Sequence, residues 1–421
     1  MKTIIVIGVG YVGLPLAIHM AKHFKVIAFD VREDRIEQLK NKFDANNEIT
    51  KAKFEEVENN IEYTLDEKKV SEGDIIIISV PTPVKKDKTP DLTYLEGASR
   101  VAGRNMKKGA IVVYESTTYP GCTEDFCLPV LKSESKLKYK EDFFIGYSPE
   151  RVNPGDKEHS INNITKIVSG DTKQTIEELE KVYSKVTKVH TTSSIKIAES
   201  AKVIENIQRD INIALFNEFA MLFDKMDLDT KEIFEAAGTK WNFMKYKCGF
   251  VGGHCIPVDP YYLAQKAQEV GYNPKLILAG RQTNEELPIF VAKKIKTLLE
   301  KQNKNPGVVK LLILGATYKE NVPDLRDSKV ENMIVSLKDS GIKDIHIWEP
   351  LIVENKTIFD VENREPKGKY DVVVYAVNHK EFKNIDVCGL IDKKSILIDL
   401  KRIFDEKKRE LENNGCIWYG L

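Results

Sequence analysis

The chain has 421 residues, more than one hydrophobic core usually serves, so two or three domains are expected. Lysine plus arginine equals aspartate plus glutamate at 64 each, which excludes a general attraction to nucleic acid or to anionic membranes. The six cysteines form no CxxC pair and no disulfide framework. The first apolar run, Thr3 to Val9, has the length of a strand and lacks the flanks of a signal peptide. We therefore expect a cytoplasmic protein with free thiols.

A glycine fingerprint follows the first predicted strand. Thr3 to Gly8 is a continuous β-branched run, as expected of a strand buried on both faces of a parallel sheet. The motif Gly8-Val-Gly10-Tyr-Val-Gly13 comes next, and a helix is predicted from Leu14 to His23. Its glycines would allow a tight turn, a close approach to a pyrophosphate and tight packing of helix on strand. The diphosphate would bind at the positive end of that helix.

An acid at the end of the second strand points to the kind of dinucleotide. Asp30 closes the predicted strand that begins at Lys25 and follows Gly13 by 17 positions, about where a ribose-binding carboxylate belongs. A carboxylate accepts from both ribose hydroxyls and repels a 2′-phosphate, so the pattern favours NAD over NADP. Arg32 and Arg35 leave this open, because either could reach a phosphate or stack on adenine.

Hydroxyl side chains follow the next two strands, predicted over Ile75–Val80 and Ala110–Glu115. Thr82 and Thr117 lie just beyond these strands, at the sheet edge where parallel α/β folds bind ligands. Each could equally be a helix cap. Further strands are predicted over 143–147, 166–169 and 187–190. The loop that begins at Ser148 is rich in turn residues and could carry substrate contacts or be a plain connection.

A long helix is predicted from Ile195 to about Met226. The segment has no proline or glycine, and its apolar residues recur in steps of three and four. Such a helix would be about 45 Å long and could link two domains and pair with its copy in a dimer. Lys202 and Asn206 are four residues apart and so share one face, as a solvated pair or as part of a site.

One cysteine stands in a glycine-rich loop, Phe250 to Asp259. Gly252 and Gly253 precede Cys255 by three and two positions, and such glycines allow close approach of a ligand and leave a thiol uncrowded. A thiolate is a strong nucleophile when a positive group or backbone N–H groups stabilise it. Taken alone, the pattern fits a buried, inert cysteine equally well.

The last part of the chain repeats the strand and helix rhythm after a helix predicted over Ile289–Lys301. The linker Asn303-Lys-Asn-Pro-Gly307 precedes a strand over 308–315, and further strands are predicted over 344–348, 371–376 and 395–399. No GxGxxG motif occurs here, so a second dinucleotide is not expected. Lys319 and Arg326 in the turn after the first strand could meet phosphates or be plain surface cations.

These features predict an α/β protein with two Rossmann-like parallel-sheet domains joined by a long central helix. We expect an N-terminal NAD-binding domain over 1–194, a central helical domain over 195–302 and a C-terminal nucleotide-binding domain over 303–421. No metal site is expected.

In this order, the motifs resemble those of the UDP-sugar 6-dehydrogenase family, which includes the UDP-glucose, UDP-N-acetylhexosamine and GDP-mannose dehydrogenases, over essentially the whole chain. The residues that carry the resemblance are Gly8 to Gly13, Glu115-Ser-Thr117, Ser148-Pro-Glu150, Glu199-Ser-Ala-Lys202 with Asn206, Phe216-Asn-Glu218, Gly252-Gly-His-Cys255 with Asp259, and Lys319 with Asp324, Arg326 and Ser328. The resemblance implies oxidation of a primary alcohol to a carboxylate with two NAD molecules in turn, a UDP-sugar substrate and a homodimer formed through the central helix.

The resemblance also assigns roles. Cys255 would capture the aldehyde as a thiohemiacetal, and Lys202 with Asn206 would stabilise oxyanions. Asp259 would assist proton transfer, Thr117 would orient water and Glu150 would bind substrate or manage protons. The cofactor would contact Gly8, Gly10, Tyr11, Val12, Gly13, Asp30, Arg35, Thr82, Thr117 and Arg326. The substrate would contact Glu150, Arg151, Lys202, Asn206, Gly252, Gly253, Tyr318 and Lys319.

One departure bears on the substrate. UDP-glucose enzymes of the family typically carry a second glutamate four residues after the one that matches Glu150, and this chain has Pro154 there. The resemblance is therefore strongest to the branch that oxidises UDP-N-acetylglucosamine or its galacto epimer. The base for thioester hydrolysis stays open between Glu150 and a water held by Thr117 and Asp259.

Other hypotheses remain. UDP-N-acetylmannosamine or UDP-glucose could be the substrate. A two-electron NAD oxidoreductase of the 3-hydroxyacyl or 6-phosphogluconate type would share a nucleotide domain followed by helices, but it needs no thiol and lacks a third α/β domain. A sensor that binds NAD without turnover is a further possibility.

Overall fold

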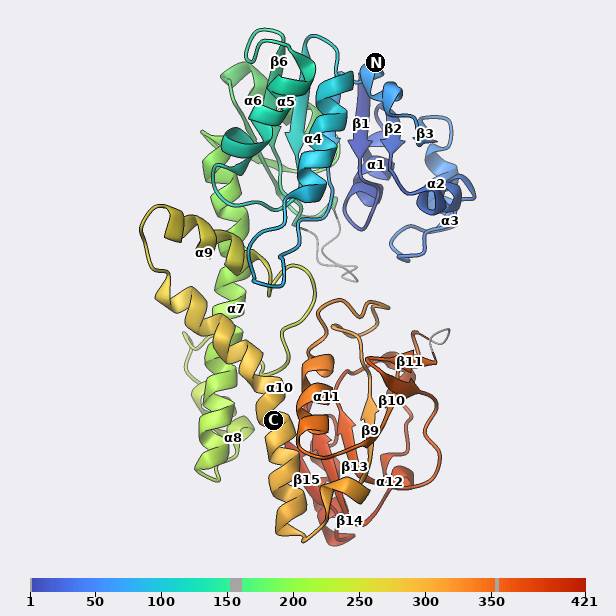
Figure 1. The fold of residues 1–421 in the computed structure, drawn as a ribbon, viewed down its shortest axis with the longest axis vertical. Helices are drawn as coiled ribbons and strands as arrows, with labels where there is room; N and C mark the ends of the chain where they lie inside the picture. Colours follow the sequence, from blue (N-terminus) through green and yellow to red (C-terminus); the bar gives the residue numbers. More distant parts are fainter. Residues whose placement is uncertain (1, 152–160, 353–355) are drawn as a thin grey trace. The chain divides into compact units, whose positions relative to one another are not determined.

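The computed structural model describes residues 2–151, 161–352 and 356–421 (Figure 1). The chain forms two compact units, one of residues 1–206 with 261–273 and one of residues 207–260 with 274–421. Pro154, which bears on the substrate, lies outside the described residues. No helix in the described ranges is long and apolar enough to cross a membrane.

The first unit contains one sheet with the strand order β3-β2-β1-β4-β5-β6-β7-β8 in its described part. All neighbouring strands are parallel except β6 and β7, which are antiparallel. The strands are β1 (Thr3–Ile7), β2 (Lys25–Phe29), β3 (Ile61–Thr64), β4 (Ile75–Ile78), β5 (Ala110–Tyr114), β6 (Phe143–Tyr147), β7 (Lys166–Gly170) and β8 (Val189–Thr191).

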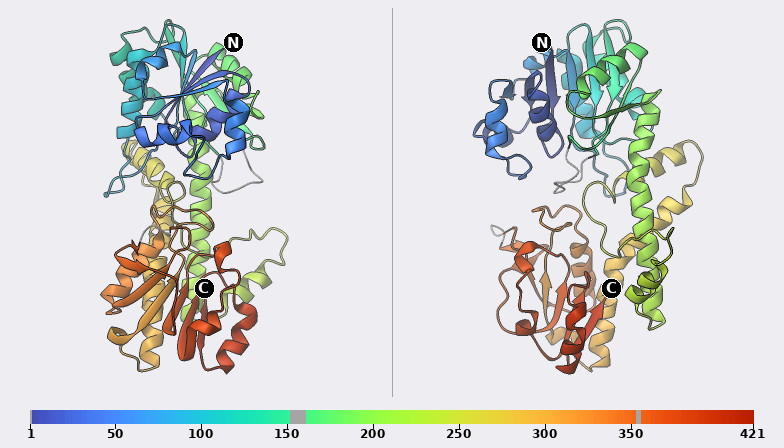
Figure 2. Two further views of the ribbon diagram at one scale, coloured as in Figure 1. Left: turned by 90° about the vertical axis from the view of Figure 1, so that its right-hand side faces the viewer. Right: turned by 180° about the vertical axis from the view of Figure 1, so that it is seen from behind.

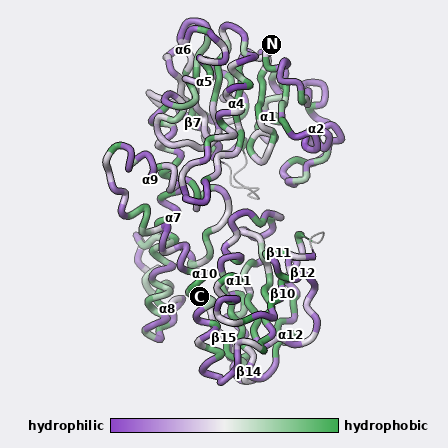
Figure 3. The backbone as a smooth tube through the Cα atoms, in the orientation of Figure 1, coloured by the Kyte–Doolittle hydropathy of each residue, from purple (hydrophilic) through white to green (hydrophobic). Residues whose placement is uncertain are grey.

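Helices cover both faces of this sheet (Figure 2). Ile4 and Val6 of β1 belong to one hydrophobic core and Ile5 and Ile7 to another, because side chains alternate across a strand. This explains why β1 is apolar throughout, and the inner strands are coloured as hydrophobic in Figure 3. The helices are α1 (Gly13–Ala21), α2 (Glu33–Lys40), α3 (Lys51–Val57), α4 (Thr93–Asn105), α5 (Leu128–Ser135) and α6 (Lys173–Tyr183), with short turns η1 (Glu67–Glu72) and η2 (Thr123–Cys127).

The second unit contains another mostly parallel sheet, in the order β11-β12-β10-β9-β13-β14-β15 over its described residues, with β11 and β12 antiparallel. The strands are β9 (Lys310–Leu314), β10 (Asp344–Trp348), β11 (Thr357–Ile358), β12 (Val361–Asn363), β13 (Tyr370–Tyr375), β14 (Ile391–Asp399) and β15 (Ile417–Gly420). The helices are α8 (Thr230–Ala237), α10 (Lys275–Lys301), α11 (Lys329–Asp339), α12 (Val387–Leu390) and α13 (Lys408–Asn413), with η3 (Pro306–Val308), η4 (Lys380–Phe382) and η5 (Asp405–Lys407). The predicted fold class is therefore confirmed.

Two helices have residues in both units, namely α7 (Ile195–Lys225) and α9 (Asp259–Glu269). The predicted long helix is confirmed at 31 residues. The helix predicted over Ile289–Lys301 is confirmed, but α10 begins earlier, at Lys275, and continues through Pro288. An interior proline costs about 3 kcal/mol. Burial of Leu287, Val291 and further apolar residues on one face of α10 outweighs that cost.

Candidate active site

The glycine turn after β1 has the shape that a dinucleotide needs. Gly8 has φ +89°, a conformation that side chains disfavour. A Cβ on Gly13 would lie 1.9 Å from the Gly8 carbonyl oxygen, so the fold itself requires this glycine. A Cβ on Gly10 would meet no atom within 4 Å. The fold leaves space at Gly10, and this space fits the close approach of a pyrophosphate to the backbone.

Asp30 supports the turn and keeps capacity for a ligand. Its Oδ2 accepts from the Val9 amide at 2.9 Å, and its Oδ1 accepts from the Arg32 amide at 3.0 Å. Each carboxylate oxygen has a second lone pair, and the half-buried side chain can accept from ribose hydroxyls. Helix α1 begins at Gly13 and has no acid in its first turn, which suits an anion at its N-terminus. The chain therefore fits NAD here.

Arg35 contacts other groups of the protein. Its side chain is buried, its Nε donates to the Val9 carbonyl at 2.8 Å, and its Nη1 lies 2.8 Å from the Asp44 carboxylate. Asp44 in turn accepts from backbone amides of residues 46, 48 and 49. The Arg35–Asp44 pair therefore stabilises the glycine turn through the Val9 carbonyl. Sequence reasoning missed Asp44, and a contact of Arg35 with cofactor remains a prediction.

Strand register brings several predicted residues to one edge of the first sheet. Ile7 of β1 pairs with Ile78 of β4, and the ladder continues through β5 to Tyr147 of β6. The turns that follow these parallel strands share that edge. They carry the glycine motif with Tyr11 and Val12, then Thr82, Thr117 and Glu150.

Glu199 fixes the loop after β5 against α7. Its buried carboxylate accepts from the Thr118 hydroxyl at 3.2 Å, the Gly121 amide at 2.5 Å, and the Thr123 amide and hydroxyl at 2.9 and 2.7 Å. Burial raises the pKa of Glu199, and these hydrogen bonds oppose that rise. Lys202, one helical turn later, is buried, and Asn206 is half-buried. Sequence reasoning gave Glu199 no role of its own.

The segment with Glu150 is also held to α7. The Glu150 Oε1 accepts from the Arg151 amide at 2.7 Å. Arg151 contacts both carboxylate oxygens of Glu205, at 2.8 and 3.2 Å, and also donates to the Thr165 carbonyl. This bidentate pair holds Arg151, the residue after Glu150, against α7. Arg151 is thereby engaged within the first unit.

In the second unit, Cys255 is half-buried and its Sγ lies 3.2 Å from the His254 Nδ1. The His254 Nε2 lies 4.0 Å from the Asp324 carboxylate. Arg326 pairs with that same carboxylate at 2.6 Å. Burial alone would raise the pKa of Asp324, but the hydrogen bonds from Arg326 hold it below its usual range. A protonated imidazole beside a thiol is the kind of neighbour that favours a thiolate. The sequence motif contains His254 but does not show its distance from the thiol.

Asp259 is buried at the start of α9, and its amide donates to the Cys255 carbonyl at 2.9 Å. The glycines before Cys255 make room for protein. A Cβ on Gly252 would lie 2.6 Å from the Asp327 carbonyl, and one on Gly253 would lie 2.6 Å from the Tyr318 ring. The cysteine loop and the turn with Tyr318 and Lys319 are therefore packed together.

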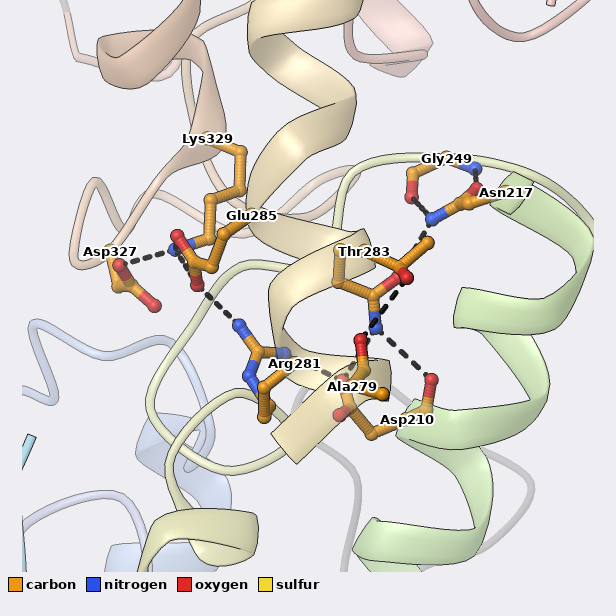
Figure 4. A network of polar contacts seen from close by, with 10 residues as sticks. Asp210, Asn217, Gly249, Ala279, Arg281, Thr283, Glu285, Asp327 and Lys329 are labelled. Atoms are coloured by element: carbon orange, nitrogen blue, oxygen red, sulfur yellow. Dashed lines mark hydrogen bonds and ion pairs between the residues drawn. The ribbon is translucent and has the colours of Figure 1, made fainter. Parts of the chain in front are cut away.

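A buried polar network anchors the cysteine loop (Figure 4). The Asn217 amide group donates to the Gly249 carbonyl at 3.1 Å, and its Oδ1 accepts from the Gly249 amide at 2.9 Å. The network continues from Asn217 through Asn284, Asp210, Arg281, Glu285 and Lys329 to Asp327. It joins α7, α10 and α11 to Gly249, just before the cysteine loop, and to Asp327, whose carbonyl faces Gly252. Sequence reasoning noted Asn217 alone and missed the rest.

The glycine turn that fits NAD is typical of a nicotinamide-dependent dehydrogenase, and the second unit carries a cysteine thiol beside an imidazole. The chain belongs to the UDP-glucose/GDP-mannose dehydrogenase family. The family's NAD binding domain matches residues 2–187, its central domain residues 196–286 and its UDP binding domain residues 312–406. The protein is accordingly an NAD-dependent UDP-sugar dehydrogenase, and the predicted family, enzyme class and cofactor are confirmed.

Similar proteins span the whole chain. Protein CapL of Staphylococcus aureus is 47% identical and covers 99% of this chain and 99% of its own. The UDP-N-acetyl-D-glucosamine 6-dehydrogenase of Pseudomonas aeruginosa is 43% identical and covers 96% of this chain and 98% of its own. The structure of the UDP-D-ManNAc dehydrogenase of Pyrococcus horikoshii matches with a TM-score of 0.88 at 30% identity, over 99% of this chain and 98% of that one.

Proposed function

We propose that the enzyme oxidises the 6-hydroxymethyl group of UDP-N-acetylglucosamine to the uronate. The relative named for this sugar is 43% identical, against 30% for the solved enzyme named for the manno sugar. Pro154 in place of a second glutamate counts against UDP-glucose. The observation that carries the chemistry is the half-buried Cys255 thiol, 3.2 Å from an imidazole nitrogen on a loop fixed by Asn217.

The proposed reaction has two oxidations joined at Cys255. Bound NAD accepts a hydride in each. In the first, the alcohol loses a hydride and a proton and becomes the aldehyde. The Cys255 thiolate then adds to the aldehyde carbon to give a thiohemiacetal, which loses the second hydride and becomes a thioester. Water cleaves the thioester and releases the uronate and the thiol, so two NADH form for each uronate.

The other proposed residues act by charge and proton transfer. Lys202 and Asn206 stabilise the oxyanions that form at the sugar carbon, and Asp259 assists proton transfer. Thr117 orients water, and Glu150 takes up protons at the edge of the first sheet. Four of these side chains belong to the first unit, whereas Cys255 and Asp259 belong to the second. Glu199 would set the position of Lys202 relative to the loop with Thr117.

Tyr318 and Lys319 would bind the UDP-sugar, and Arg326 of the same turn would bind the cofactor. Arg151, Gly252 and Gly253 would also contact the UDP-sugar. The division into domains over 1–194, 195–302 and 303–421 remains part of this proposal. We also propose a homodimer through α7. Ile197, Ile204, Leu215 and Leu222 are all 45% or more exposed along this helix, and such a row of large apolar side chains favours a second copy of the chain.

Product counting tests the proposal. With UDP-N-acetylglucosamine, two NADH per sugar consumed and a uronate product are expected, and one NADH per sugar with an aldehyde product would favour a two-electron dehydrogenase. Rates with a panel of UDP-sugars separate the gluco, galacto and manno substrates. A protein that binds NAD but turns over none of them would support the sensor hypothesis.

The thiol has its own test. Cys255→Ser should abolish uronate formation, because an alkoxide forms far less readily than a thiolate. Cys388→Ser is the matched control, since Cys388 is equally half-buried, and it should keep full activity. Burial raises the pKa of Cys248 to about 12, so iodoacetamide at neutral pH should react only slowly with Cys248. Full activity of Cys255→Ser would remove the cysteine from the mechanism.

A further inference from the structure

Asn217 is a fully buried asparagine inside α7, and its side chain bonds the backbone that leads to the cysteine loop. Its Nδ2 donates to the Gly249 carbonyl at 3.1 Å, and its Oδ1 accepts from the Gly249 amide at 2.9 Å. The same Nδ2 donates to the Asn284 Oδ1 at 2.8 Å. Asparagine is a weaker helix former than alanine, and burial removes its amide from water. These hydrogen bonds therefore compensate for the asparagine at this position.

The residue before Gly249 is tied to the same turn of α7. The Cys248 Sγ donates to the Phe216 carbonyl at 3.2 Å. Burial raises the pKa of Cys248 to about 12, so this thiol stays a neutral donor at physiological pH. Two consecutive residues of the segment are thus bonded to two consecutive residues of the helix. Such a pair of ties fixes the direction in which the chain enters the cysteine loop as well as its starting point.

Closer to the thiol, the loop packs against the turn after β9. A Cβ on Gly252 would lie 2.6 Å from the Asp327 carbonyl, and one on Gly253 would lie 2.6 Å from the Tyr318 ring. The Asp327 carboxylate lies 2.8 Å from the Lys329 Nζ at the start of α11. The loop is therefore fixed a second time, at the residues three and two positions before the thiol.

One polar network joins these two contact regions (Figure 4). The Asn284 Nδ2 donates to the Asp210 Oδ1 at 2.8 Å, and the Arg281 Nη1 lies 2.6 Å from that same oxygen. Glu285 pairs with Arg281 and lies 2.9 Å from the Lys329 Nζ. The Arg281 and Lys329 side chains are both 1% exposed. Loss of one partner leaves a buried charge uncompensated, so the network resists any movement that separates its members.

We propose that Asn217 is a positioning residue for the Cys255 thiol, and that the network from Asn217 to Lys329 holds the thiol where it captures the aldehyde before the aldehyde leaves. Asn217 touches neither sugar nor cofactor in this proposal and acts through the loop. The inference rests on the thiohemiacetal proposed for Cys255. With fast capture the thiohemiacetal gives up the second hydride to NAD, whereas with slow capture the aldehyde leaves after one NAD has been reduced.

The fate of the aldehyde is the test. Asn217→Ala removes both bonds to Gly249 and lets the loop shift, and a displacement of about 1 Å can slow a reaction about 100-fold. In a single turnover we expect the first NADH to form within about threefold of the wild-type rate, and uronate formation to fall at least about 10-fold. NADH per sugar consumed should fall from two toward one, with an aldehyde that semicarbazide traps for mass spectrometry. Two NADH per sugar and no trapped aldehyde would overturn the proposal.

A second variant breaks the far end of the network. Lys329→Met removes the ammonium group that pairs with Glu285 and Asp327, and it should also release aldehyde. If Asn217→Ala does not fold, Lys329→Met decides by the same criterion. Release of aldehyde from Asn217→Ala but not from Lys329→Met would contradict a network that acts as one unit.

The matched control separates positioning from a general loss of stability. Asn60→Ala removes a hydrogen bond of the same kind in the first unit, where the Asn60 Nδ2 donates to the Ala21 carbonyl at 2.9 Å. This variant should still form two NADH per sugar and release no aldehyde. Release from Asn60→Ala as well would mean that any destabilised variant loses the aldehyde, and the special role of Asn217 would fall.

Failure of the inference can be told apart from failure of the proposed function. All variants are measured beside the wild type with whichever UDP-sugar is oxidised fastest, and Cys255→Ser provides the reference for complete loss of capture. A wild type that forms one NADH and an aldehyde would end the proposed function, and with it any capture to be positioned. Two NADH per sugar in the wild type and in both network variants would leave the function intact and remove only the positioning role.

Discussion

The first turns of the two sheets use the same backbone arrangement. Gly8 follows β1 with φ +89°, and Gly315 follows β9 with φ +86°. The amide of each glycine donates to the carbonyl that ends the neighbouring strand, Phe29 or Trp348, at 2.9 and 3.0 Å. The next amide donates in each case to an acid just beyond that strand. These bonds run from Val9 to Asp30 at 2.9 Å and from Ala316 to Glu349 at 2.7 Å.

The two turns differ in the groups that contact the acidic side chain. Asp30 is half-buried and keeps lone pairs for a ligand. Glu349 is 1% exposed, and it accepts from the Thr317 and Leu351 amides and contacts the His379 Nε2 at 3.0 Å. The Asn321 amide donates to the other ring nitrogen of His379, so Nε2 carries the proton that Glu349 accepts. The protein itself takes the place that a ribose would need.

The helices differ as well. In the first unit α1 begins five residues after the turn glycine, whereas in the second α11 begins at Lys329, well beyond Gly315. The comparison teaches that a glycine turn with an acid is a general support for a parallel sheet. A dinucleotide site needs in addition an open acid, a bare backbone at Gly10 and a helix that starts at once.

Gly13 should show the largest effect. In Gly13→Val the new Cβ would lie 1.9 Å from the Gly8 carbonyl, so helix α1 can no longer pack on β1. We expect loss of NAD binding by at least about 100-fold together with a lowered melting temperature. Titration with NAD and thermal unfolding measure these two effects. The control is Gly97→Ala in the exposed face of α4, where no atom lies within 4 Å and stability should rise by up to about 1 kcal/mol. Wild-type affinity in Gly13→Val would contradict the packing argument.

The substitution of Glu349 should have the second largest effect. Glu349→Ala leaves the buried amides of residues 316 and 317 and the half-buried amide of residue 351 without their acceptor. We expect the second unit to lose about 3 kcal/mol or more of its free energy of unfolding in urea. Asp30→Ala, at a half-buried position with two such bonds, should cost about 1 kcal/mol. An equal cost at both positions would show that burial does not distinguish the two acids.

The effect at Glu349 should depend on pH. Burial alone would raise the pKa of Glu349, but the hydrogen bonds from His379 and the backbone amides outweigh it and lower the pKa below its usual 4.5. The group therefore contributes stability above its unfolded value, and this contribution is lost as the pH falls through its folded value. The difference between wild type and Glu349→Ala should shrink below about pH 4.5, as urea unfolding at pH 7 and pH 4 can show. A difference in the free energy of unfolding that grows as the pH falls would contradict a lowered pKa of Glu349.

Gly10→Ala sharpens the comparison, because it should affect the ligand and not the fold. The added methyl meets no protein atom within 4 Å, so the melting temperature should stay unchanged. Affinity for NAD should fall about 10- to 100-fold, since the methyl would occupy the space of the pyrophosphate. Isothermal titration measures it. Unchanged affinity would mean that no ligand approaches this backbone.

Asp30→Asn should have the smallest effect. The amide keeps the shape but lowers the repulsion of a 2′-phosphate, so the preference for NAD over NADP should fall by roughly tenfold. The ratio of kcat/KM for the two cofactors measures it, with Glu37→Gln at an exposed position of α2 as control. An unaltered ratio would assign the discrimination to another residue.

Sequence reasoning recovered the features that depend on neighbouring residues. The β-branched runs predicted β1, β4 and β5, the three- and four-residue steps predicted α7, and the fingerprint predicted the turn that fits NAD. The sequence pattern misled where packing between residues far apart in the chain outweighed a local rule. The proline at 288 marks a helix start by local rules, yet the core behind α10 carries the helix straight through it.

The amino-acid sequence by itself determined most of the strands, the long helix, the glycine turn and the family, because these follow from short-range periodicity and from residues a few positions apart. It missed the four strands β3, β11, β12 and β15. Only the tertiary structure decided which acidic side chains are open to a ligand and which are enclosed by other groups of the protein. Glu115 meets Lys166 across 51 positions, Glu199 meets Thr118 across 81, and Glu349 meets His379 across 30. The physical reason is that burial and charge pairing depend on side chains brought together by strand register and helix packing, and no local pattern records them.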